Sequence, residues 1–96
     1  MEKIYKYKLN LQDTQIINAP IVKPLCVQKQ GNELVLWAEV DTAKDNEIFQ
    51  VTIVGTGHSV PTDAGEYLST VQDGYYVWHV YLNSLTNYLQ AQRGGI

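Results

Sequence analysis

The sequence has few of the residues that form disulfides, bind metal ions or bind nucleic acids: cysteine, histidine, lysine and arginine. Its 96 residues include one cysteine, Cys26, so an intrachain disulfide is excluded. Seven lysines and arginines stand against ten aspartates and glutamates, and the net charge of -3 argues against a nucleic-acid partner. Two histidines and the one cysteine, widely separated, offer no zinc-binding spacing. We therefore expect no disulfide, no nucleic-acid partner and no metal site.

Long apolar runs are also missing. No stretch reaches the roughly 18 consecutive apolar residues of a membrane span, and the first residues lack the apolar core of a signal peptide. We therefore expect no membrane segment and a cytoplasmic location. A hydrophobic fraction of 45% in a chain of this length predicts one compact domain with a single core.

What the chain does have is apolar and polar residues alternating at period two, with turn signals between the segments. The expected strands span residues 4–11, 15–19, 25–30, 34–41, 47–54, 66–72 and 75–82. The pattern predicts an all-β, mainly antiparallel fold, a small sandwich or barrel of about seven strands. Asp73-Gly74 predicts a tight hairpin turn with positive φ at both central positions, and Leu68 and Val71 are expected to anchor the strand before it.

The last part of the chain has a different pattern. Leu85 and Leu89 are spaced i,i+4, which predicts a short C-terminal helix capped by Asn83 or Ser84. We therefore expect a single β-rich domain over residues 1–82, followed by a helix and a frayed tail over residues 83–96.

One loop has unusual chemistry. A long apolar run stops at Val54, and the chain continues with Gly55, Thr56, Gly57, His58 and Ser59. Glycines allow a close approach of backbone to an anion, while the hydroxyls and the imidazole add hydrogen-bonding groups. Neither the dinucleotide-binding fingerprint nor the phosphate loop of nucleoside triphosphatases is matched. Two interpretations stay open: a ligand-contacting loop and a simple hairpin connection.

The strand expected at residues 75–82 has two different faces. One is apolar and is expected to join the core: Tyr76, Trp78, Val80 and Leu82. The other is aromatic with polar tips: Tyr75, Val77, His79 and Tyr81. Composition alone leaves open whether this second face meets solvent, another subunit or a pocket.

Several segments resemble a family of small uncharacterised proteins found largely in bacteriophage and prophage genomes. The most specific are Gly55-Thr56-Gly57-His58 and Val77-Trp78-His79-Val80-Tyr81, and the similarity extends to about Leu82. The chain departs from the pattern at three positions, where an aromatic residue, a proline and a glycine are expected: Val54, Ser59 and Ser69. The resemblance implies a viral origin and supplies no mechanism.

These observations predict a non-enzymatic, phage-type accessory protein with an anti-defence role in the host cytoplasm. The loop at residues 55–59 and the face formed by Tyr75, His79 and Tyr81 would enclose a small polar, nucleotide-type host signal. We expect no catalytic residue and no cofactor, because no nucleophile, base and orienting group can be named together. The alternative is a protein-interaction module that inhibits a host enzyme or acts in phage assembly. A homo-oligomer is compatible with both.

Overall fold

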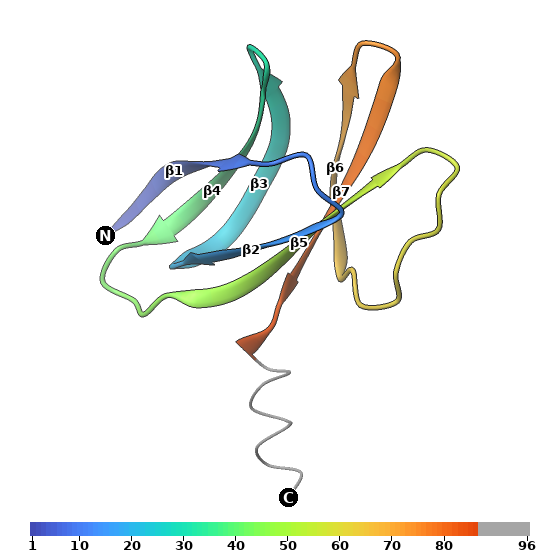
Figure 1. Ribbon diagram of the computed structural model, residues 1–96. Coiled ribbons are helices and arrows are strands. Elements are labelled where there is room, and N and C mark those ends of the chain that lie inside the picture. The colour runs from blue at the N-terminus through green and yellow to red at the C-terminus, as the bar shows by residue number, and fades with distance from the viewer. Residues whose placement is uncertain (87–96) are drawn as a thin grey trace, which may run out of the picture.

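A computed structural model describes residues 1–86, which form seven β-strands. The strands are β1 (Glu2–Leu9), β2 (Thr14–Ala19), β3 (Ile21–Gln30), β4 (Glu33–Asp41), β5 (Glu47–Gly55), β6 (Glu66–Asp73) and β7 (Tyr76–Ser84). They form two antiparallel sheets, one in the order β1-β4-β3 and the other in the order β2-β5-β7-β6 (Figure 1). The all-β, antiparallel prediction is confirmed, and the two sheets make a sandwich-like fold without a closed barrel.

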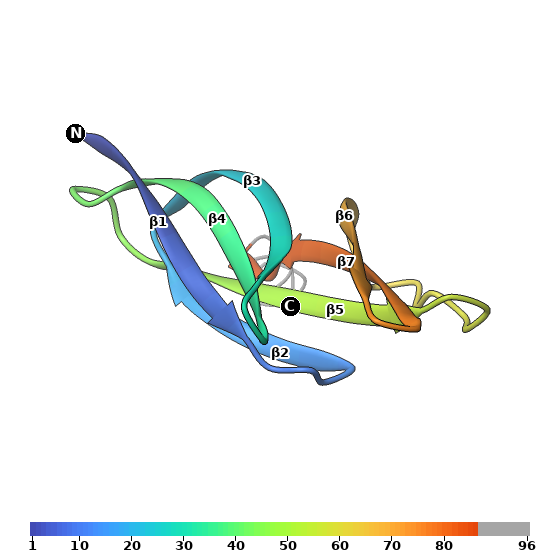
Figure 2. The ribbon, with the colours of Figure 1, turned by 90° about the horizontal axis from the view of Figure 1, so that it is seen from above.

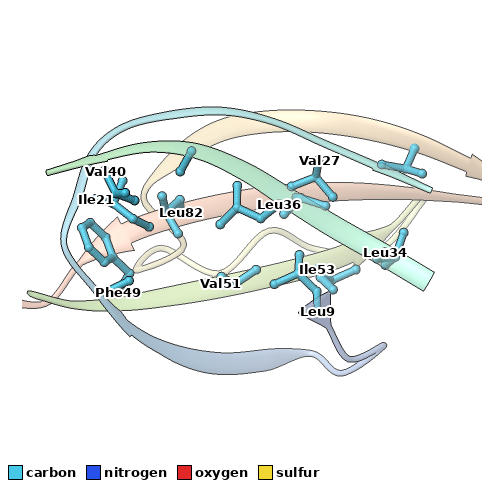
Figure 3. Close-up of a cluster of buried hydrophobic side chains, with 14 residues drawn as sticks. Leu9, Ile21, Val27, Leu34, Leu36, Val40, Phe49, Val51, Ile53 and Leu82 are labelled. Atoms are coloured by element: carbon cyan, nitrogen blue, oxygen red, sulfur yellow. The ribbon is translucent and has the colours of Figure 1, made fainter. Parts of the chain in front are cut away.

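The core lies between the two sheets, where the inward faces of their strands meet. On β4 the inward residues are those that the alternation predicts, and Leu36, Ala38 and Val40 have no exposed surface. On β5, Phe49, Val51 and Ile53 face them across the gap (Figure 3). Figure 2 shows the three-stranded sheet lying over β2 and β5. Burial of each such leucine, valine, isoleucine or phenylalanine side chain stabilises the fold by about 1.5–3 kcal/mol, which makes this core the main source of stability.

Strand β6 contains a bulge that explains its two anchors. Leu68 and Val71 are three residues apart, so a regular strand would turn them to opposite faces. The register with β7 shifts between Tyr67 and Ser69, which inserts Leu68 as an extra residue. Val71 is buried and Leu68 packs against the core, so both predicted anchors are confirmed.

The two sheets are tied together where β3 passes β6. The backbone N–H of Val27 donates to the Ser69 hydroxyl over 2.8 Å, and Lys29 Nζ lies 2.8 Å from Asp73 Oδ1. Trp78 Nε1 donates to the other oxygen of Asp73 over 3.4 Å. Ser69 stands where the resemblance leads one to expect glycine, and its hydroxyl here satisfies a backbone donor on the edge of the other sheet.

The β6–β7 hairpin is confirmed, but its turn is shifted by one residue. Asp73 pairs with Tyr76, so the two turn residues are Gly74 and Tyr75. Gly74 has a φ of 63° and Tyr75 does not have a positive φ, which is the pattern of a type II′ turn. The prediction of two positive φ angles was therefore wrong. Asp73 stays in the strand, where Lys29 and Trp78 hold its carboxylate.

Three further predictions need correction. Tyr76 was expected to join the core, but it is 64% exposed. The first strand was expected to reach residue 11, but β1 ends at Leu9, and Leu11 is exposed in the following turn. Strand β7 runs on to Ser84, so Asn83 and Ser84 pair with β5 and do not cap a helix. The remainder of the predicted helix and tail, residues 87–96, lies outside the described residues. Within residues 1–86, no helix is long and apolar enough to cross a membrane.

Stability is expected to depend on pH through Asp73. Hydrogen bonds from Lys29 and Trp78 lower the pKa of Asp73 below its usual 3.8. A carboxyl group with a lowered pKa in the folded state stabilises the fold at pH values above its unfolded pKa, and this stabilisation is lost as pH falls through the folded pKa. Asp73→Asn should lower the melting temperature at neutral pH and leave it unchanged well below the folded pKa, as measured by circular dichroism.

Asp45→Asn, in the exposed β4–β5 turn, is the matched control and should behave like the wild type. If the difference in melting temperature between Asp73→Asn and the wild type is the same at every pH, the role assigned to Asp73 is refuted.

Candidate functional site

The loop at residues 56–65 crosses from one end of the four-stranded sheet to the other. Strand β7 lies between β5 and β6 and is antiparallel to both, so β5 and β6 run parallel. A parallel connection cannot be a tight hairpin, because the chain has to return along the length of the sheet (Figure 1). Of the two interpretations left open by the sequence, the hairpin connection is therefore wrong.

Both ends of this loop are held by hydrogen bonds. At its start, Thr56 N donates to Val77 O and His58 N donates to Gly55 O. Near its end, Asn83 Nδ2 donates to Asp63 O over 3.0 Å. The loop is thus attached to β5 and to both ends of β7.

An open hollow of about 500 Å³ lies between this loop and the end of β5. Strand β2 pairs with β5 only up to Thr52, so Val54 and Gly55 extend beyond the start of β2. The hollow is lined by Asp13, Thr14, Thr52, Ile53, Val54, Gly55, His58, Ser59, Pro61 and Trp78. The lining therefore combines a carboxylate, hydroxyls and an imidazole with an indole and several aliphatic groups.

Gly55 allows the imidazole of His58 to pack closely over the strand. A Cβ atom at position 55 would lie 3.2 Å from His58 Cδ2 and 3.4 Å from a ring carbon of Trp78. Gly57 serves a different purpose, since its φ is 92° and a Cβ there would meet nothing within 4 Å. One glycine makes room for the ring and the other makes the turn that delivers it.

A second polar cluster lies on the outer face of the four-stranded sheet. His79 Nε2 is 2.8 Å from Thr56 Oγ1, and His79 Nδ1 is 3.0 Å from Thr70 Oγ1. Thr70 Oγ1 is in turn 2.6 Å from the Tyr67 hydroxyl, and the Tyr67 ring packs edge-on against Tyr81 at 5.8 Å. We call these five residues the hydroxyl–imidazole cluster. It links the start of the loop to β7 and β6.

Most of the predicted site residues fall into two groups, and Gly57 and Tyr75 belong to neither. Gly55, His58 and Ser59 line the hollow, whereas Thr56, His79 and Tyr81 belong to the cluster. Gly57 lies between them in the turn. Tyr75 is fully exposed in the β6–β7 turn, which stands apart from the loop in Figure 1.

Sequence reasoning missed several residues at these sites. Asp13, Thr14 and Trp78 line the hollow, and Tyr67 and Thr70 complete the cluster. Trp78 was assigned to the core, and it does pack against the core while one part of its ring borders the hollow. Thr70 pairs with His79 across β6 and β7 in the register set by the hairpin turn, so placing the turn at Gly74 and Tyr75 would have found Thr70.

The charges around the hollow restrict its chemistry. Asp13 is the lining carboxylate, and none of the lining residues is a lysine or an arginine. Within residues 1–86, no group of three or more histidine, cysteine, aspartate or glutamate side chains is placed to hold a metal ion. The arrangement suits a ligand recognised by hydrogen bonds and by aromatic packing more than one recognised by strong charge.

Fold and geometry together define a small antiparallel β-sandwich with an open hollow of mixed polar and apolar lining under a crossover loop. The chain belongs to the family described as a domain of unknown function, DUF7352, whose profile matches residues 1–90. No curated protein and no solved structure matches the chain.

Two glycines of the loop at residues 56–65 test how closely its end packs against β7. Gly57 and Gly65 have φ angles of 92° and 89°, so alanine at either position costs about 1 kcal/mol or more in backbone strain. A Cβ at Gly65 would also lie 2.5 Å from Leu82 O. In urea unfolding, Gly65→Ala should lose clearly more free energy of unfolding than Gly57→Ala. Equal losses would show that the end of the loop does not lie against β7 as described.

Proposed function

We propose that this protein is a non-enzymatic binding protein that holds a small polar molecule with an aromatic ring, of nucleoside or nucleotide type. The observation that carries the proposal is the hollow itself, in which the His58 imidazole lies beside the Trp78 indole next to Asp13, Thr14 and Ser59. Its volume of about 500 Å³ falls within the range of known ligand sites.

The lining residues supply complementary interactions for such a molecule. An aromatic base can pack against the indole, and the Asp13 carboxylate can accept hydrogen bonds from amino or hydroxyl groups. His58 is the lining residue that is able to gain a positive charge. Because no ammonium or guanidinium group accompanies it in the lining, we favour a ligand of low negative charge over a di- or triphosphate.

Taken with the resemblance to phage proteins, such binding would serve to sequester a host signalling molecule. A protein that acts by occupancy needs affinity and no turnover, and a preformed hollow suits that role. The setting would then be the cytoplasm of the infected cell.

The test is isothermal titration calorimetry with adenosine, guanosine, cytidine and uridine and their 5′-monophosphates. We expect at least one to bind, and His58→Ala to weaken that binding by about tenfold or more, which is about 1.4 kcal/mol. The unliganded melting temperature should hardly change, because His58 is exposed and surface substitutions usually alter stability by less than about 0.5 kcal/mol.

Thr62→Ala is the control, since Thr62 is in the same loop and does not line the hollow. Its affinity should equal that of the wild type. If His58→Ala binds as tightly as the wild type, the hollow is not the binding site. If no compound of the panel binds, the ligand is not of the nucleoside or nucleotide type.

A second candidate function, a protein-interaction module, is favoured by the exposed tyrosines of the β6–β7 hairpin. Tyr75 is fully exposed, and Tyr76 is 64% exposed while its ring stacks on Trp78 at 5.5 Å. Tyrosine is enriched among residues that dominate protein interfaces. A host enzyme inhibited by this protein, or a phage assembly partner, would contact this hairpin.

For this candidate, Tyr75→Glu should abolish the retention of a host protein in a pull-down, because a carboxylate would be buried in the contact. Tyr5→Glu, at the exposed Tyr5 of β1, is the matched control and should retain it. An unchanged set of retained proteins with Tyr75→Glu would count against the hairpin as a docking element.

A further inference from the structure

The four outer strands of the two sheets are protected in different ways. Strands β3 and β6 face each other and are joined by the Val27–Ser69 hydrogen bond and the Lys29–Asp73 ion pair. Strand β1 carries charged side chains at half of its positions: Glu2, Lys3, Lys6 and Lys8. Charged side chains, lysine above all, are a common means of keeping an edge strand from pairing with another chain.

Strand β2 has none of these protections. Its sequence, Thr-Gln-Ile-Ile-Asn-Ala, contains no charge and no proline, and its pairing with β5 runs without a bulge from Thr14 to Ala19. Ile16 in its middle is 58% exposed. An edge strand that is regular, neutral and apolar at its centre is a template for strand addition.

The register identifies which backbone groups of β2 face outward. Ile53 N donates to Asp13 O, which places residue 13 in a hydrogen-bonded pair with β5. In an antiparallel ladder such pairs alternate with pairs that exchange no bond. Gln15 and Ile17 therefore bond β5, and the N–H and C=O groups of Thr14, Ile16 and Asn18 point away from it.

We propose that β2 pairs with β2 of a second copy of this chain, about a two-fold axis that passes beside Ile16. The three outward-facing residues are self-complementary in an antiparallel arrangement, since Ile16 then faces Ile16 and Thr14 faces Asn18. The threonine hydroxyl and the asparagine amide can hydrogen-bond across the pair, and no like charges oppose each other. The two four-stranded sheets become one continuous sheet with an isologous interface.

The composition of β2 argues for a second copy over an unrelated protein. A strand of another protein would have to match the outward N–H and C=O groups of Thr14, Ile16 and Asn18. In the two-fold arrangement, the same three residues of a second β2 provide a hydrogen-bonding partner for each of these groups. Thr14 also lines the hollow, so the pairing places Asn18 of the partner subunit beside each hollow. The pairing does not depend on what the hollow binds.

Sedimentation equilibrium over a concentration series from the micromolar range upward tests the proposal. The wild type should reach the mass of two chains. Ile16→Lys should raise the dimer dissociation constant by about tenfold or more, because two ammonium groups would face each other at the axis. Ile4→Lys is the matched control, since Ile4 is 62% exposed on edge strand β1, and it should dimerise like the wild type.

Disulfide trapping distinguishes this geometry from any other dimer. In a chain carrying Cys26→Ser, Ile16→Cys should form an intersubunit disulfide with oxidised glutathione, because the Cα atoms of a hydrogen-bonded pair lie about 5.5 Å apart, within disulfide range. Ile4→Cys should not. A single-chain mass at every concentration overturns the proposal, as does a dimer that neither Ile16→Lys weakens nor Ile16→Cys traps.

Discussion

The position of β7 between β5 and β6 is the constraint on which the rest of the four-stranded sheet depends. Pairing antiparallel to both neighbours, β7 makes them parallel to each other, and the chain can leave β5 and enter β6 only by crossing the sheet. The hollow and the hydroxyl–imidazole cluster both follow from this crossing. The hollow lies beneath the loop, and the cluster ties the first residue of the loop to β7 and β6. A hairpin between β5 and β6 would have produced neither.

Much of the core could be predicted from the sequence because burial has a local signature. The inward residues of β4 and β5 alternate with their neighbours as a half-buried strand requires, and they are buried as expected. The strand count and the antiparallel pairing follow from the same pattern. Ser84 shows where local signals fail, since its place in β7 is decided by pairing with Phe49, thirty-five residues away. The local spacing of leucines that predicts a helix after Ser84 contains no information about a pairing partner so far away in the sequence.

The candidate site was harder to predict for the same reason. The loop at residues 55–59 could be singled out from its composition, but its surroundings are set by the sheet order, which the alternation does not encode. Trp78 illustrates this, because a tryptophan on an apolar face is a core residue in sequence terms. It borders the hollow only because Gly55 pairs with it at the end of the sheet. His79 and Tyr81 share a face as expected, yet their contacts are with Thr56, Thr70 and Tyr67.

The two threonine contacts of His79 also give the cluster a direction. A neutral imidazole carries one ring proton for its two nitrogens, so it donates to one threonine and accepts from the other. With the proton on Nε2, Thr56 accepts and the Thr70 hydroxyl donates to the ring, and the Tyr67 hydroxyl then donates inward to Thr70. With the proton on Nδ1 the sequence reverses, and Thr70 donates outward to Tyr67. The tautomer of the half-buried His79 ring therefore sets the polarity of a hydrogen-bonded row that begins at the loop and ends on β6.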